Sequence, residues 1–140
     1  MLQQSSSTRK IVDWLEAQRY EVVPGVSYTC CWDTRTITYR PQDSVSTIVN
    51  GLLHECGHVL VDRSIRRGGT RYKRGYPFPR AGKARPNISA VDLVHEEIEA
   101  WHRGLALAQR LGIRVNLRAY WQDYGKCVKS YFRKAIRRVL

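Results

Sequence analysis

The sequence predicts a mostly helical α+β fold, with a short antiparallel β-hairpin lying beside a central helix. Several segments carry apolar residues at helical spacing, and one segment, residues 26–39, is dense in β-branched and aromatic residues. The length of 140 residues suits about one hydrophobic core. Hydrophobic residues make up 43% and charged residues 26%, as in globular proteins. We therefore expect residues 1–140 to form a single domain.

Local signals place the elements of the N-terminal half. Pro24-Gly25 is typical of a turn, and Pro41 is expected to end a strand. Asp43 or Ser44 can cap the helix that follows, since either side chain accepts hydrogen bonds from free N–H groups. The expected elements are a helix at about 8–19, strands at Val26–Trp32 and Thr36–Tyr39, and a helix from about 45 to 64.

The C-terminal half combines a loop with two further helices. Repeated glycine and proline in residues 65–88 predict a long, irregular, basic loop inserted into the domain. Ser89 is expected to cap a helix that runs to Leu111 and is closed by Gly112. Asn116 then caps a basic amphipathic helix over residues 116–140.

The N-terminus and the cysteines indicate a reducing compartment. The start of the chain has no apolar stretch behind a basic segment, and no run approaches the roughly 18–20 apolar residues that span a bilayer. The cysteines are Cys30, Cys31, Cys56 and Cys127, and none of them forms a CxxC pair. We therefore expect reduced thiols and a cytoplasmic location, with no membrane partner.

The pattern His54-Glu55-Cys56-Gly57-His58 is H-E-x-x-H and lies within a helical segment. Residues four apart share one face of a helix, so two imidazoles can reach a single tetrahedral zinc ion. The glutamate beside the first histidine can take a proton from a zinc-activated water. The pattern predicts Zn²⁺ bound by His54 and His58, with Glu55 as general base.

A zinc site of this kind needs a third protein ligand. The nearest set of suitable side chains lies in the next predicted helix, and any of them could complete the site. A solvated helix face is the ordinary alternative for each of them. The candidates are His95, Glu96, Glu97, Glu99 and His102.

Together, the H-E-x-x-H pattern and the segment Glu96-Glu97-Ile98-Glu99-Ala100-Trp101 resemble the gluzincin metallopeptidases. The chain is most similar to small ImmA/IrrE-like and minigluzincin proteins of bacteria and phages, over roughly residues 8–111. Their third ligand is the glutamate of an E-x-x-A pattern, which Glu97-Ile98-Glu99-Ala100 matches. Trp101 stands where that family often has Asp or Asn, and the insertion at 65–88 is unusual.

The resemblance implies a zincin-like fold and zinc-dependent hydrolysis of a protein or peptide substrate. It points to Glu97 as the third ligand, with Glu96 and Glu99 as alternatives, and Ala100 can pack against Gly57 where the helices cross. A further residue often stabilises the oxyanion, and His102 is the first candidate, ahead of His95, Tyr72 and Tyr76. Asp62 can orient an imidazole. In zincins an extended substrate pairs with an edge strand, for which Thr36–Tyr39 is the candidate.

Two basic segments favour a second function. The net charge is +12, and residues 63–85 and 126–138 are rich in Arg and Lys and contain no acid. Tyr72, Tyr76 and Phe78 interleave with the first segment, a composition that suits phosphate and base contacts. An acidic protein substrate would also explain the two segments. The alternative function is a nucleic-acid-binding protein with a structural or catalytically silent zinc. A protease acting on DNA-bound proteins, as in SprT-like zincins, would fit if His95 or His102 were the third ligand. The sequence leaves the oligomeric state open.

Overall fold

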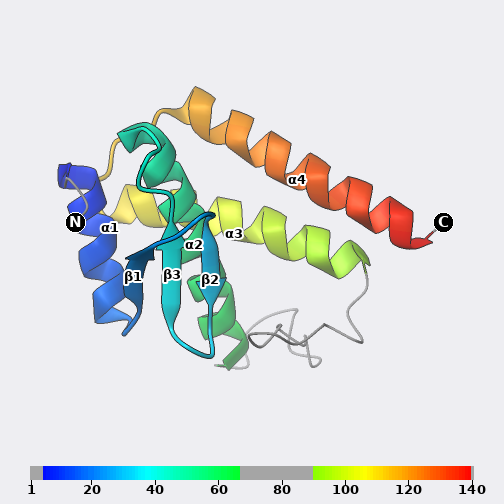
Figure 1. Ribbon diagram of the computed structural model, residues 1–140, viewed down its shortest axis with the longest axis horizontal. Coiled ribbons are helices and arrows are strands. Elements are labelled where there is room, and N and C mark those ends of the chain that lie inside the picture. Colours follow the sequence, from blue (N-terminus) through cyan, green and yellow to red (C-terminus); the bar gives the residue numbers. More distant parts are fainter. Residues whose placement is uncertain (1–4, 67–89, 140) are drawn as a thin grey trace.

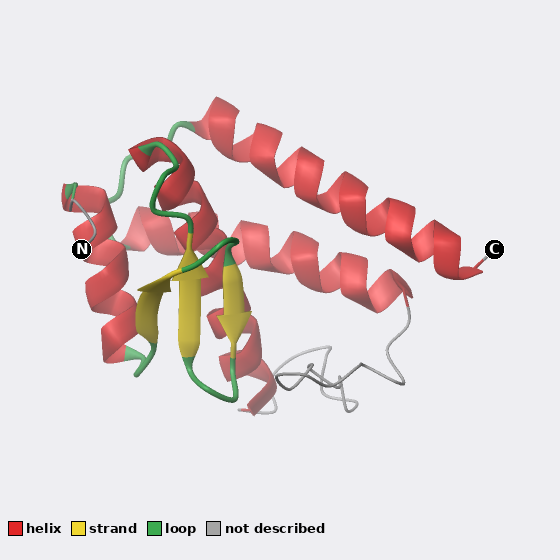
Figure 2. Ribbon diagram, in the orientation of Figure 1, coloured by secondary structure: helices red, strands yellow, loops and turns green. Residues whose placement is uncertain are grey.

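The computed structural model describes residues 5–66 and 90–139, and within them it is mostly helical with one small sheet (Figures 1 and 2). The predicted α+β class is confirmed. The predicted basic loop lies outside the described residues except at its start, where α2 continues to Arg66. The elements are α1 (Ser6–Ala17), β1 (Glu21–Pro24), β2 (Thr29–Cys31), β3 (Thr36–Tyr39), α2 (Val45–Arg66), α3 (Ala90–Arg110) and α4 (Leu117–Val139).

Side-chain caps fix where three of the helices begin. The Ser5 hydroxyl accepts from the Thr8 amide (3.1 Å), so α1 starts two residues earlier than predicted. Ser44 caps α2 by accepting from Thr47 N (3.2 Å). Asn116 caps α4 as predicted, through Ala119 N (3.1 Å). These bonds satisfy amides that have no partner within the first turn of a helix.

The sheet has the order β1-β3-β2, so β3 is its central strand. It pairs antiparallel with β2, as the hairpin prediction requires, and parallel with β1. The prediction that Thr36–Tyr39 is an edge strand is therefore wrong. We did not expect β1, because Pro24-Gly25 was interpreted as a turn only. Proline is tolerated at the end of an edge strand, where its missing N–H costs little.

Helix α2 lies at the centre of the molecule, between the sheet and α3. The sheet and α1 pack on one side of it, α3 crosses the other side, and α4 runs antiparallel to α3 (Figure 1). A Cβ at Gly57 would overlap the carbonyl oxygen of Ala100, and one at Gly104 would overlap that of Leu53. Glycine is thus required where α2 and α3 cross, and the expected contact of Gly57 with Ala100 is confirmed.

The hydrophobic core forms where α1, the sheet, α2 and α3 meet. It is built around fully buried residues such as Ile11, Leu15, Ile37, Leu52 and Leu53. Among the described residues, no helix combines the length and apolarity needed to cross a bilayer. Because the core fixes α2 against α3, it also fixes the relative positions of the polar residues at their crossing.

Candidate metal centre

His54 and His58 lie one turn apart on the face of α2 that meets α3. Both are buried, with 7% of each residue exposed. Their Nε2 atoms are 3.2 Å apart, and the rings are nearly perpendicular. Two ring nitrogens this close either share a proton or face a common cation.

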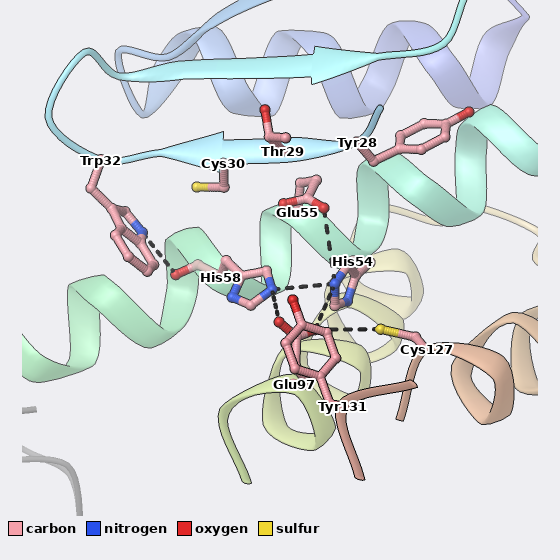
Figure 3. Close-up of a pocket in the computed structure, with 10 residues that line it drawn as sticks. All are labelled: Tyr28, Thr29, Cys30, Trp32, His54, Glu55, His58, Glu97, Cys127 and Tyr131. Atoms are coloured by element: carbon pink, nitrogen blue, oxygen red, sulfur yellow. Dashed lines mark hydrogen bonds and ion pairs between the residues drawn. The ribbon is translucent and has the colours of Figure 1, made fainter. Parts of the chain in front are cut away.

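Glu97 of α3 completes a three-donor cluster. Its Oε2 lies 3.0 Å from Nε2 of His54, and its Oε1 lies 3.3 Å from Nε2 of His58. A tetrahedral zinc with bonds of about 2.0–2.1 Å would hold its ligand atoms about 3.3–3.4 Å apart. The observed separations of 3.2, 3.0 and 3.3 Å are near that edge length, with the two contacts of Glu97 made by different carboxylate oxygens. Figure 3 shows the three side chains converging, two from α2 and one from α3.

The other candidate ligands on α3 lie elsewhere. Glu96 is buried and faces Nδ1 of His58 at 3.5 Å, on the ring edge away from Glu97. Glu99 is bound by Nε of Arg103 at 2.7 Å. His95 is exposed. Of the five candidates, Glu97 alone approaches both Nε2 atoms, although its role as a ligand stays a prediction.

His102 is exposed and does not line the cavity next to this cluster. Its ring packs against Trp121 (5.3 Å between centroids) and Tyr124 (5.8 Å), both on α4. The site therefore gains no oxyanion donor from His102. The alternative donors Tyr72 and Tyr76 lie outside the described residues.

Neighbouring side chains hold the two imidazoles in place. The indole of Trp101 stacks on His54, with centroids 4.3 Å apart and planes inclined by 26°. Glu96 faces the second nitrogen of His58, which is the usual way to orient a ligating histidine. Asp62, which we expected in that role, is buried in the last part of α2. Trp101 thus positions His54 by stacking, at the place where gluzincins often have a polar residue.

Three carboxylates are buried around the two histidines. Burial raises the pKa of Glu55, and Glu97 and Glu96 add to this, while the histidines oppose it. Burial also acts to raise the pKa of Glu97, but His58 and His54 outweigh it and hold that pKa well below its usual range. Burial acts to lower the pKa of His58, and Glu97 reverses this. A bound cation would offset the negative charge of these buried carboxylates, as a protonated His58 does in its absence.

A cavity of about 420 Å³ opens beside the cluster. Glu55 lies between His54 and β2, with its Oε1 3.9 Å from Nε2 of His54 (Figure 3). Tyr28, Thr29, Cys30 and Trp32 line the cavity from β2 and its flanks, and Cys127 and Tyr131 line it from α4. The cavity thus runs between a strand and a helix, with the His–Glu cluster on its wall.

Sequence reasoning missed Cys127 and Tyr131. Sγ of Cys127 donates to Oε2 of Glu97 at 3.5 Å, and donor atoms of His54, Glu97 and Cys127 all lie within 4.8 Å of one another. These three residues could hold a metal ion. Burial, followed by the charge of Glu97, raises the pKa of this thiol to about 12. The available signal was their spacing of four, which puts both on one face of α4.

Comparisons with protein-family models, with curated proteins and with solved structures find no match.

Proposed function

We propose that the protein is a zinc-dependent metallopeptidase. The observation that carries the proposal is the convergence of His54, His58 and Glu97 at tetrahedral spacing, with Glu55 beside them and a cavity in front. Two histidines and a glutamate leave a fourth position for water, as catalytic zinc sites do. The same arrangement supports the resemblance to gluzincins, including the close approach of Gly57 to Ala100.

His54, His58 and Glu97 would hold the ion, which when bound polarises water and the substrate carbonyl. Glu55 would take the proton from that water and pass it to the leaving amine. Its burial supports this role, because a carboxylate with a raised pKa is a stronger base. Tyr131 lines the same cavity from α4, where its hydroxyl could stabilise the oxyanion in place of His102.

An extended substrate would lie along β2 rather than β3. In the described part of the chain, β2 pairs only with β3, so its other edge has no strand partner. Thr29 and Cys30 of β2 border the cavity (Figure 3). Trp32 fixes the end of the strand by donating to the carbonyl of His58 at 3.4 Å. A peptide added to this edge would pass over Glu55 and the two histidines.

The test is the variant Glu55→Gln, which keeps the shape of the side chain and removes the base. We expect bound zinc to stay near one equivalent by elemental analysis, while cleavage of a peptide library, followed by mass spectrometry, falls by at least about 100-fold. Glu99→Gln is the matched control, since that glutamate pairs with Arg103 on the same helix. Undiminished cleavage by Glu55→Gln would refute the peptidase mechanism.

A second candidate function is nucleic-acid binding, with zinc in a structural or silent role. It is favoured by the exposure of Lys126, Lys129, Arg133 and Lys134 along α4. Such a surface predicts DNA or RNA affinity that falls steeply with added salt. Fluorescence anisotropy with labelled DNA and RNA, for the wild type and for Lys126→Glu/Lys129→Glu, tests this. Absence of binding in low salt would remove the candidate.

A further inference from the structure

Helix α4 brings a thiol next to the candidate metal centre. Cys127 contacts Glu97 through its sulfur, and its donor atom belongs to the same compact group as those of His54 and Glu97 (Figure 3). Cys30, on β2, lines the cavity too, but does not belong to that group. Both cysteines thus line the same cavity, but only Cys127 lies close to the candidate metal-binding atoms.

The distance between Sγ of Cys127 and Oε2 of Glu97 suits two atoms that bind the same metal ion. A tetrahedral zinc with a Zn–S bond of about 2.3 Å and a Zn–O bond of about 2.0–2.2 Å would place the two atoms about 3.5–3.7 Å apart. The observed distance is 3.5 Å. The group of mutually close donor atoms comprises His54, Glu97 and Cys127 and does not include His58. The sulfur is therefore near enough to Glu97 to share an ion with it, and it is the candidate for the position otherwise left for water.

We propose that Cys127 is a fourth ligand of the metal, and that its thiolate closes the site at rest. The inference rests on the proposed zinc site of His54, His58 and Glu97. On ligation the thiol would release its proton to solvent, and its sulfur would take the place of the water on the ion. In opening, water would take the place of the sulfur, and the thiol would regain a proton from solvent. Four protein ligands make a closed site, whereas three and a water make a catalytic one.

The build of α4 suits reversible contact. Its first half is anchored, since Tyr120 donates to the Trp101 carbonyl at 2.5 Å and Asn50 donates to Asp123 at 3.1 Å. After Cys127, Val128 is still buried and Tyr131 lines the cavity. Phe132 and Ile136 further along are more than half exposed, as Leu117 is at the start of the helix. The thiol thus lies between the anchoring residues Tyr120 and Asp123 and the exposed end of the helix.

Gly125 lies in α4 two residues before Cys127 and lowers the stability of the helix at that point. Glycine inside a helix costs about 1 kcal/mol relative to alanine. A Cβ at Gly125 would meet no described atom within 4 Å, so no close packing explains the residue. It weakens α4 beside the proposed ligand.

The test is cobalt substitution of the full chain, because Co²⁺ reports ligand type in its absorption spectrum. We expect visible d–d bands of a tetrahedral site together with a near-ultraviolet band from sulfur-to-cobalt charge transfer. Cys127→Ser should lose the charge-transfer band, keep the d–d bands and bind Zn²⁺ at least about tenfold more weakly. Cys30→Ser, the matched control, should keep the charge-transfer band.

The outcomes separate this inference from the proposed function. Cobalt bound without a charge-transfer band, or a band lost in Cys30→Ser and kept in Cys127→Ser, would overturn ligation by Cys127 and leave the zinc site intact. No cobalt binding at all would overturn both. As a second readout, Cys127→Ala should cleave peptides several-fold faster than the wild type, and an unchanged rate would contradict closure at rest.

Discussion

His54 and His58 differ in what holds them, although they sit on one helix face. His54 is fixed by an aromatic surface, the indole of Trp101, and His58 by the carboxylate of Glu96. A carboxylate on the second nitrogen increases the basicity of a ligating imidazole, whereas stacking fixes only its orientation. Glu97 contacts both rings and also receives the Cys127 thiol. Glu97 is therefore the residue on which the whole site depends.

Replacement of Glu97 tests the site at the level of one side chain. Glu97→Gln keeps the volume but removes the charge that balances the cation, so affinity for Zn²⁺ should fall at least about tenfold. Competition with a chromogenic chelator measures this. Glu96→Gln should weaken binding less, because Glu96 acts through His58. If Glu97→Gln bound zinc as tightly as the wild type, the ligand would have to be another side chain.

The sequence predicts contacts within the candidate metal centre only between residues that are also close together in the chain. The spacing of His54 and His58 dictates their shared face in any α-helix. The choice of Glu97 over Glu96 and Glu99 came from resemblance, because all three occur within one turn and helix rotation decides between them. Cys127 could not be predicted, since its approach to Glu97 depends on how α4 packs against α3.

At the scale of elements, the crossing of α2 and α3 determines the geometry of the site. His54, Glu55 and His58 flank Gly57, and Glu97 precedes Ala100 by one turn, so the point of closest backbone approach lies next to the proposed metal ligands. With no side chain at Gly57, the carbonyl of Ala100 can contact the α2 backbone. A wider crossing would move Glu97 away from both imidazoles.

Two glycine substitutions with opposite expected effects test this. Gly57→Ala forces the helices apart and should lower the free energy of unfolding by about 1–3 kcal/mol, with weaker zinc binding. Gly125→Ala adds a methyl group in open space on α4 and should raise the free energy of unfolding by up to about 1 kcal/mol. Urea unfolding followed by circular dichroism measures both. Equal stabilities for the two variants would contradict the close crossing.

The helices were predictable because their apolar residues repeat with the period of the helix, and Ser44 and Asn116 mark two of the starts. The sheet was less predictable. Strand β1 is only four residues long and pairs parallel with β3. No turn residue signals a parallel pairing, whereas the hairpin of β2 and β3 has a local connection. A hairpin without β1 leaves β3 at an edge of the sheet, and the sequence therefore predicts that the substrate pairs with β3. In the structure β3 is the central strand, and the free edge belongs to its neighbour β2.

For the whole molecule, the candidate metal centre brings together segments that are distant in the chain. His54 and His58 come from α2, Glu97 from α3 and Cys127 from α4, so an ion bound there would cross-link three helices. The sheet and α1 pack on the opposite side of α2 and contribute no donor atom to the cluster. Binding of a metal there would thus be coupled to folding mainly through the helices.

Metal addition and removal should therefore change global stability. A ligand that binds only the folded state stabilises it by about 2.7 kcal/mol when its free concentration is 100 times its dissociation constant. We expect Zn²⁺ to raise the Tm of the metal-free protein in a calorimetric scan, and a chelator to reverse the rise. Mg²⁺, which prefers oxygen ligands, should produce no comparable rise. The rise should nearly vanish in Glu97→Ala, whose side chain can no longer join α3 to α2. A full rise in that variant would mean that zinc stabilises the protein from a different site.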